Sequence, residues 1–248
     1  MTKCEKLICA IDHADQFAAA NLVASVRNHV GAIKLGLEFF TANGTKGVRE
    51  IAKYNAPVFL DLKFHDIPNT VSAAVAAAVK LGAFMLTVHS AGGPEMMRAA
   101  ADAASETAES TGRARPLVIG VTVLTSLDND DMKSICYKYP VRKQARRLAD
   151  LAKESGLDGV VCSPHEIRLI RKQCGDDFTL VVPGIRPKDS PNIDQKRVMT
   201  PEEALGLGAD YLVIGRPISG AKDPNVAVRR IVDGIENWGI GEKRELEN

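Results

Sequence analysis

Residues 56–70 read APVFLDLKFHDIPNT, and this stretch decides the expected fold and the expected site. Its first five residues form an apolar run typical of a buried strand. Three charged side chains, Asp61, Lys63 and Asp66, follow where a strand should give way to a helix. Because side chains alternate along a strand, Asp61 and Lys63 are predicted to share one face. Charges on the inner side of a buried strand are costly unless they are paired or used, so the stretch predicts an active site.

Apolar, β-branched runs of the same kind recur eight times along the chain. Most are continuous rather than alternating, as expected for parallel strands that are covered on both faces. The predicted strands are Lys6–Ile11, Ala32–Gly36, Val58–Lys63, Phe84–His89, Leu117–Leu124, Gly159–Cys162, Thr179–Pro183 and Tyr211–Gly215.

Helix-like segments separate these strands, with Asp15 as a candidate N-cap and Gly82 as a candidate terminator. The predicted helices are Ala18–His29, Val71–Leu81, Pro94–Ala104, Arg142–Glu154, Pro164–Lys172, Pro201–Leu207 and Asn225–Trp238. Eight strand–helix units of roughly 30 residues each match an α/β fold of the (β/α)₈ TIM-barrel type, which takes about 250 residues. A doubly wound open sheet is the rival, but the glycine-rich fingerprint after its first strand is absent.

The composition narrows the class of protein. The chain has 248 residues, of which 45% are hydrophobic, and a net charge of +1. We expect one domain over residues 1–248, with a loose charged tail at 241–248. The near-neutral charge argues against nucleic acid as a partner, and the apolar runs are too short to span a membrane. Five cysteines, none spaced as Cys-x-x-Cys, predict free thiols and a cytoplasmic protein.

In a barrel of this kind the active site lies at the carboxyl ends of the strands. The residues that the sequence places there are Asp12, Lys34, Asp61, Lys63, Asp66, His89, Ser90, Thr125, Ser126, Ser163, Pro183, Gly184, Arg186, Gly215 and Arg216. Gly215 and Arg216 follow the last strand, where barrels often bind phosphate through backbone N–H groups and an arginine fork.

Each charged residue has a structural alternative when taken alone. Lys34 could extend to solvent, and Asp61 with Lys63 could be only a structural ion pair. Asp66 could be only an N-cap for a helix that begins at Pro68. The functional interpretation gains weight because four charges of alternating sign converge on one rim.

The neutral candidates are weaker. Isolated histidines such as His65 and His89 more often have a structural role than bind a ligand. No His or Cys cluster in the sequence has the spacing of a metal site. Thr125 and Ser126 lack a Gly-x-Ser-x-Gly context, which argues against a serine nucleophile.

Together these residues resemble the orotidine 5'-phosphate decarboxylase family over essentially the whole chain. The resemblance rests on Asp12, Lys34, the run Asp61–Thr70, Leu124-Thr125-Ser126, Pro183-Gly184-Ile185-Arg186-Pro187, Gln195 and Val213-Ile214-Gly215-Arg216-Pro217-Ile218. The ten-residue run is the most diagnostic part, and the chain does not depart from the family pattern at these positions.

The resemblance implies decarboxylation of orotidine 5'-phosphate to uridine 5'-phosphate, the last step of de novo pyrimidine nucleotide synthesis, without metal or cofactor. It places Lys34, Asp61, Lys63 and Asp66 around the reacting carbon, with Lys63 as the proton donor. It also implies a homodimer with shared active sites, in which Asp66 and Thr70 come from the partner chain.

The resemblance implies substrate-binding roles for further residues. Asp12 and Lys34 match residues at the ribose, and Thr125 and Ser126 match residues at the pyrimidine. The remaining residues implied in substrate binding are Asp61, Thr70 and Pro183, together with Arg186, Gln195, Gly215 and Arg216 around the phosphate.

The chemistry of this reaction suits a charged array. Loss of CO₂ from C6 of the ring leaves a carbanion whose lone pair lies in the ring plane, outside the π system. A positioned ammonium in a water-poor site can stabilise that charge and then supply a proton. Binding of the distant phosphate is expected to close loops over the ring, with residues 127–140 and 187–197 as the candidate loops.

Two alternatives remain open. One is a magnesium-dependent decarboxylase of the kind that acts on 3-keto-gulonate 6-phosphate, which shares Asp-x-Lys-x-x-Asp but needs a carboxylate where this chain has Lys34. The other is a non-catalytic barrel that binds nucleotides, although an intact charged array has no evident use in binding alone.

Overall fold

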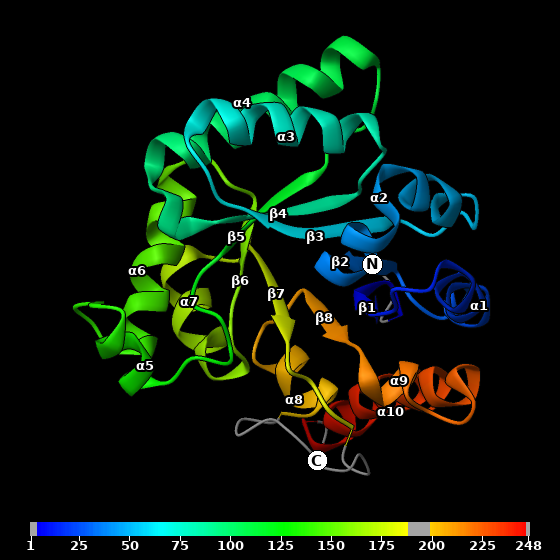
Figure 1. Cartoon of the computed structure of the whole chain (residues 1–248). Coiled ribbons are helices and arrows are strands. Elements are labelled where there is room, and N and C mark those ends of the chain that lie inside the picture. The colour runs from blue at the N-terminus through cyan, green and yellow to red at the C-terminus, as the bar shows by residue number, and fades with distance from the viewer. Residues whose placement is uncertain (1–3, 188–198, 247–248) are drawn as a thin grey trace.

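Eight parallel strands close into one barrel, in the order in which they follow one another along the chain (Figure 1). The structure, a computed structural model, describes residues 4–187 and 199–246, with side chains described as far as Trp238. The strands are β1 (Leu7–Ile11), β2 (Ala32–Gly36), β3 (Val58–Phe64), β4 (Met85–His89), β5 (Leu117–Val121), β6 (Gly159–Val161), β7 (Thr179–Pro183) and β8 (Tyr211–Ile214). The ring closes between β1 and β8, where Leu7 lies opposite Leu212. The predicted (β/α)₈ fold class is confirmed.

Helices surround the strands on the outside of the barrel (Figure 1). They are α1 (Gln16–Val26), α2 (Leu37–Ala52), α3 (Pro68–Lys80), α4 (Pro94–Thr111), α5 (Asn129–Ser134), α6 (Val141–Glu154), α7 (Ile167–Cys174), α8 (Pro201–Gly206), α9 (Arg216–Ser219) and α10 (Pro224–Leu246). The candidate N-cap is confirmed, since the Asp15 carboxylate accepts a hydrogen bond from the N–H of Ala18 at the start of α1. None of the helices in the described residues is both long enough and apolar enough to cross a bilayer.

Three helices were not assigned from the sequence. Helix α2 is interrupted at Gly44, whose φ of 58° and ψ of −159° are not helical. Asn43 and Gly47 are also poor helix formers, so the sequence of this segment lacks a clear helical pattern. Helices α5 and α9 are short, and α5 lies inside the segment predicted as a loop over residues 127–140.

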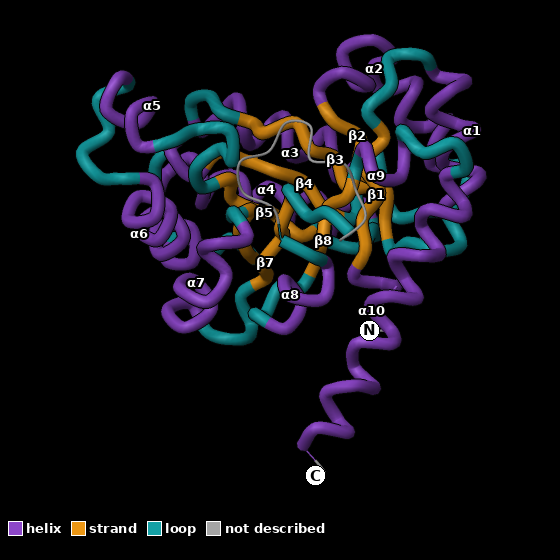
Figure 2. The backbone as a smooth tube through the Cα atoms, turned by 90° about the horizontal axis from the view of Figure 1, so that it is seen from below, coloured by secondary structure: helices purple, strands orange, loops and turns teal. Residues whose placement is uncertain are grey.

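The carboxyl-terminal helix is longer than expected. The sequence predicts a helix that ends at Trp238 and a loose tail from Gly241. The structure instead continues α10 to Leu246, in a stretch that projects away from the barrel (Figure 2). The predicted end of this helix at Trp238 is therefore wrong, and the loose tail over residues 241–248 stays a prediction.

Strand alternation divides the core into two clusters. Leu7, Cys9 and Ile11 of β1 belong to the cluster between the strands and the helices, whereas Ile8 and Ala10 belong to the cluster inside the barrel. Each fully buried large apolar side chain contributes about 1.5–3 kcal/mol through the hydrophobic effect. The inner cluster fills the middle of the barrel, and several of the positions that follow it toward the carboxyl ends of the strands hold polar groups.

Three of these inward positions follow directly from the period of two. Lys34 comes two residues after Ala32, Asp61 two after Phe59, and Thr87 two after Met85, and all three preceding residues belong to the inner cluster. The barrel therefore carries a layer of polar side chains directly above an apolar floor.

Candidate active site

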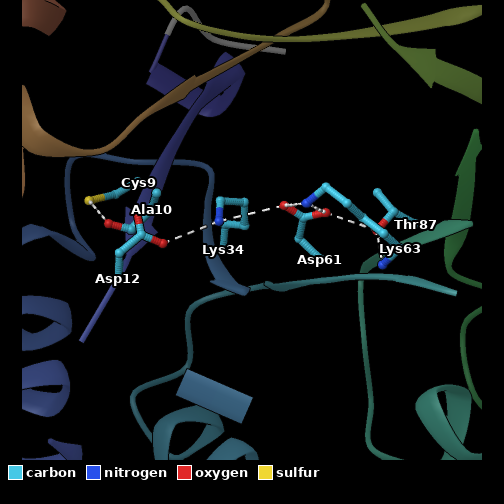
Figure 3. A network of polar contacts seen from close by, with 7 residues as sticks. All are labelled: Cys9, Ala10, Asp12, Lys34, Asp61, Lys63 and Thr87. Atoms are coloured by element: carbon cyan, nitrogen blue, oxygen red, sulfur yellow. Dashed lines mark hydrogen bonds and ion pairs between the residues drawn. The ribbon is translucent and has the colours of Figure 1, made fainter. Parts of the chain in front are cut away.

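The carboxylate of Asp61 is the centre of the polar layer (Figure 3). The Nζ atom of Lys63 lies 2.9 Å from both of its oxygens. The Nζ atom of Lys34 lies 3.6 Å from Oδ2, and the hydroxyl of Thr87 donates a hydrogen bond to Oδ1 at 2.9 Å. The prediction that Asp61 and Lys63 lie on one face is confirmed as geometry.

Lys34 links this centre to the end of β1. Its Nζ atom lies 3.4 Å from Oδ1 of Asp12, so the charges of Asp12, Lys34, Asp61 and Lys63 alternate in one line (Figure 3). The Lys34 side chain is 13% exposed and therefore does not extend into solvent, which was the alternative considered for it.

The backbone at Lys63 departs from regular strand geometry. The pairing between β3 and β4 shifts register between Leu60 and Phe64, and Lys63 has a left-handed φ of 52°. A non-glycine residue in this region is uncommon and strained. The N–H of Lys63 donates to the hydroxyl of Thr87 at 2.9 Å instead of to a strand carbonyl. Strain of this kind, held in place by neighbours, is characteristic of functional sites.

Two small residues leave room for the charged side chains. A Cβ atom at Gly36 would lie 3.1 Å from Nζ of Lys34, and a Cβ atom at Gly215 would lie 3.4 Å from Oδ2 of Asp12. Glycine at the ends of β2 and β8 therefore lets the line of charges reach the mouth of the barrel.

Burial and charge act in opposite directions on Asp61. Burial tends to raise the pKa of its carboxyl, but the ammonium groups of Lys34 and Lys63 and the hydrogen bonds from Lys63 and Thr87 outweigh it. The pKa of Asp61 therefore lies below its ordinary value, and the carboxylate is charged at neutral pH.

A cavity of about 200 Å³ lies beside this line, at the ends of β1, β2, β7 and β8. Seven residues predicted for the strand ends share its wall: Asp12, Lys34, Pro183, Gly184, Arg186, Gly215 and Arg216. Since Asp12 and Lys34 belong to both the cavity and the line of charges, the two features form one continuous site.

Four other predicted residues lie outside this group in the described chain. Asp66 is exposed and accepts a hydrogen bond from the N–H of Ile67, and it is not the N-cap of α3, because Ile67 occupies that position. Thr70 is exposed on α3, and Thr125 and Ser126 are exposed in the turn after β5. Gln195, and the candidate loop over residues 187–197 except for Pro187, lie outside the described residues.

The two histidines lie together beside Lys63. The ring centroids of His65 and His89 are 5.3 Å apart, and both rings line a second cavity of about 190 Å³ with apolar residues from the ends of β5 and α5. Burial, followed by the charges of His65 and Lys63, lowers the pKa of His89. His89 is therefore neutral at pH 7.

Thr87 is the residue of this site that sequence reasoning missed. It lies inside β4, whereas the candidates were taken from strand ends. Its position two residues after the inward-facing Met85, with a hydroxyl at a buried position, is the signal that could have found it.

A divalent cation does not fit the line of charges. The ammonium of Lys34 stands between the carboxylates of Asp12 and Asp61, the two groups that would otherwise be natural ligands for magnesium. Across residues 4–187 and 199–246, His, Cys, Asp and Glu side chains also form no group of three or more with the arrangement of a metal site.

The chain matches a known family over most of its length. The sequence model of the Orotidine 5'-phosphate decarboxylase / HUMPS family matches residues 5–231. The orotidine 5'-phosphate decarboxylase of Rhodospirillum rubrum is 53% identical over 233 residues, which cover 94% of each chain. The orotidine 5'-phosphate decarboxylase of Moorella thermoacetica is 52% identical over 233 residues, 94% of this chain and 92% of that one.

Solved structures show the same relationship. The crystal structure of orotidine 5'-phosphate decarboxylase from Lactobacillus acidophilus is similar with a TM-score of 0.82 and 34% identity, over 92% of this chain and 98% of that one. The crystal structure of an uncharacterized conserved protein from Geobacillus kaustophilus is similar with a TM-score of 0.80 and 35% identity, over 92% of this chain and 99% of that one. With its closed barrel, its alternating line of charges and these relatives, the chain belongs to the orotidine 5'-phosphate decarboxylase / HUMPS family.

Proposed function

We propose that this protein is a carboxy-lyase that converts orotidine 5'-phosphate to uridine 5'-phosphate and CO₂, in pyrimidine nucleotide synthesis. The observation that carries the proposal is the position of Lys63, whose Nζ atom lies 2.9 Å from both oxygens of a buried carboxylate at the mouth of the barrel. The curated relatives of this name, about half identical over nearly the whole chain, support the assignment.

The reaction needs a positive charge where the substrate loses its carboxylate. As the C6–CO₂ bond breaks, its electron pair stays on C6, in the plane of the ring. The ammonium of Lys63 stabilises this charge in a partly dehydrated site and then gives C6 a proton. Asp61 holds the ammonium in place through the ion pair described above, and Lys34 contacts the same carboxylate.

The cavity beside the line of charges suits the rest of the nucleotide. Gly215 and Arg216 follow the last strand, and Arg186 follows β7, so two arginines and a glycine line the part of the cavity assigned to the phosphate. Asp12 and Lys34 line the path between this end and the reacting carbon, where they suit the ribose hydroxyls. Pro183 contributes to the wall of the same cavity, and Gln195 is assigned to the phosphate by resemblance.

In the proposed complex the pyrimidine ring, which contains the reacting carbon C6, lies at Lys63, and the ribose separates it from the phosphate. Thr125 and Ser126, in the turn after β5, are assigned to its polar edge. Their side chains are exposed, so they are accessible to a ring that enters from the mouth of the barrel. Closure of residues 127–140 over the ring remains a prediction, and the capping box of Asp128 and Asp131 at the start of α5 gives this segment an ordered element that could move as a unit.

We further propose that the active unit is a homodimer of one-domain chains, with Asp66 and Thr70 completing the partner's site. The exposure of both residues supports this arrangement, as does the large apolar side chain of Ile67 between them, which is 66% exposed. Exposed apolar surface next to charged groups is typical of an interface. We place the enzyme in the cytoplasm, where the five free cysteines would remain reduced.

The activity is tested by following the ultraviolet absorbance of orotidine 5'-phosphate after it is mixed with protein treated with EDTA. The proposal expects loss of absorbance and formation of uridine 5'-phosphate and CO₂ in equal amounts. Activity that appears only when magnesium is added would favour the metal-dependent alternative. Tight binding of uridine 5'-phosphate without any turnover would favour a non-catalytic barrel.

The shared site is tested by mixing two inactive variants, Lys63→Ala and Asp66→Asn, after dissociation and reassociation. In a mixed dimer, one of the two sites receives an intact Lys63 and an intact Asp66. Equal mixing is expected to restore about one quarter of the wild-type activity, as for any isologous dimer with a composite site. If Asp66 serves its own chain, the mixture stays inactive, and the shared-site proposal is wrong.

A further inference from the structure

Thr87 lies in the interior of β4 and is fully buried, with an exposed fraction of 0%. Its hydroxyl oxygen makes two contacts of 2.9 Å, accepting the N–H of Lys63 and donating to Oδ1 of Asp61 (Figure 3). The hydroxyl therefore connects the main chain of the residue that carries the ammonium to the side chain that holds the ammonium.

The first contact satisfies a backbone N–H group, that of Lys63, with a hydrogen bond. Where the β3–β4 pairing shifts between Leu60 and Phe64, the N–H of Lys63 does not take its place in the regular ladder, and the residue adopts a φ of 52°. A buried N–H without a partner is unfavourable, and an L residue in this region is strained. A threonine hydroxyl on the neighbouring strand satisfies the N–H and so stabilises the turn that aims Lys63 inward.

The second contact fixes the carboxylate. A carboxylate that is held only by flexible lysines can rotate about its Cβ–Cγ bond. Donation from Thr87 to Oδ1 sets the plane of the Asp61 carboxylate, which leaves both oxygens facing Lys63 and Oδ2 facing Lys34. A hydroxyl is one of the few groups that can accept and donate at the same time, as this position requires.

We propose that Thr87 is a positioning residue for the decarboxylation: its hydroxyl sets the orientation of Asp61 and of the Lys63 main chain, and thereby the position of the Lys63 ammonium. This inference rests on the proposed function of the site. Thr87 acts through Asp61 and Lys63.

A purely structural role for Thr87 is the competing explanation, and pH separates the two. Asp61 faces Lys63 on its own strand, Lys34 on β2 and His89 on β4, with Asp12 on β1 beyond Lys34. Among these groups, Thr87 adds a hydrogen bond that favours the charged carboxylate. Without the hydroxyl, Asp61 should take up a proton at a higher pH. The acidic limb of the pH profile of kcat should therefore move to higher pH.

The experiment compares Thr87→Val, which keeps the branched shape and removes the hydroxyl, with Thr87→Ser, which keeps the hydroxyl. We expect Thr87→Val to lower kcat by about 10- to 100-fold, the scale of one hydrogen bond to a charged group, with KM changed by less than about threefold. Thr87→Ser should retain kcat within about threefold of wild type, because both contacts remain possible. Thr107→Val, at a buried threonine of α4, is the matched control and should leave kcat unchanged.

The outcomes discriminate between the possibilities. Thr87→Val with wild-type kcat, or with a lowered kcat but an unmoved acidic limb in the pH profile of kcat, would overturn the proposal. If Thr87→Val does not fold, Thr87→Ser and Thr87→Ala make the same comparison, because the two side chains differ only by the hydroxyl. If only the serine variant folds, the hydroxyl serves the fold and the positioning role is wrong. Absence of activity in the wild-type protein would instead refute the proposed function.

Discussion

Replacing Lys63 by alanine removes the group on which the proposed chemistry depends, while leaving most of the local structure in place. After the change, Asp61 keeps Lys34 at 3.6 Å and the hydrogen bond from Thr87 at 2.9 Å, so its charge is not left alone. The Lys63 side chain is also 29% exposed. We therefore expect a stability loss of about 1–2 kcal/mol, below the 3–5 kcal/mol seen when a fully buried pair is broken.

The expected loss of activity is far larger. In the structure, Nζ of Lys63 lies 2.9 Å from a carboxylate oxygen of Asp61. We take about the same separation between Nζ and C6 of the carbanion. At an effective dielectric constant of about 20, such a contact is worth at most about 5–6 kcal/mol, or about 10⁴-fold in rate. Loss of the positioned proton donor adds about 10²- to 10⁴-fold. We expect kcat of Lys63→Ala to fall by at least about 10⁴-fold.

The assay follows ultraviolet absorbance of orotidine 5'-phosphate at saturating substrate, with circular dichroism as a check of folding. The matched control is Lys53→Ala, at a lysine whose side chain is 67% exposed and forms an ion pair with Glu50 at the surface. Its activity should equal that of the wild type, and its stability should change by less than about 0.5 kcal/mol. A folded Lys63→Ala variant that kept more than about a tenth of the wild-type kcat would refute the assigned role, since a tenfold loss corresponds to only about 1.4 kcal/mol.

Other perturbations test other parts of the molecule. Arg216→Ala should lower kcat/KM for orotidine 5'-phosphate but barely affect turnover of orotidine, which lacks the phosphate; equal losses on both substrates would contradict the phosphate assignment. Because the pKa of His89 lies below 6.5, the unfolded chain takes up a proton first as the pH drops, and native stability falls below about pH 6.5. His89→Asn should therefore reduce the decrease in thermal midpoint between pH 7.5 and 5.5, and an unchanged decrease would show that other groups cause it. In the native protein at pH 8, an aromatic disulfide reagent should modify the exposed Cys136 rapidly but spare Cys9, whose pKa burial raises to about 12; rapid modification of Cys9 would contradict its burial.

The barrel could be predicted because its signals are local and repeated. Each apolar run forms a strand that is buried on both faces, by helices outside the barrel and by side chains inside it, and eight such runs leave little choice of architecture. The boundaries were least certain where apolar, β-branched residues continue past the end of a strand, as at β5, which ends at Val121 and not at Leu124. Helix α2 was not predicted, because Gly44 interrupts its helical pattern.

The line of charges could also be predicted, because the period of two along a strand decides which side chains point inward. The same rule applied inside β4 would have found Thr87. The left-handed turn at Lys63 could not be predicted in this way, because a register shift between two strands depends on the contacts of both strands. The positions of Asp66 and Thr70 relative to a second chain are likewise a property of an assembly and not of one barrel.

The most direct test of the central claim is a crystal structure of the protein with uridine 5'-phosphate bound. The account predicts that the phosphate lies against Gly215 and Arg216, and that C6 of the ring lies next to Nζ of Lys63, with Asp61 holding that ammonium. A ring bound away from Lys63, or an ammonium of Lys63 turned from C6 toward bulk solvent, would contradict it.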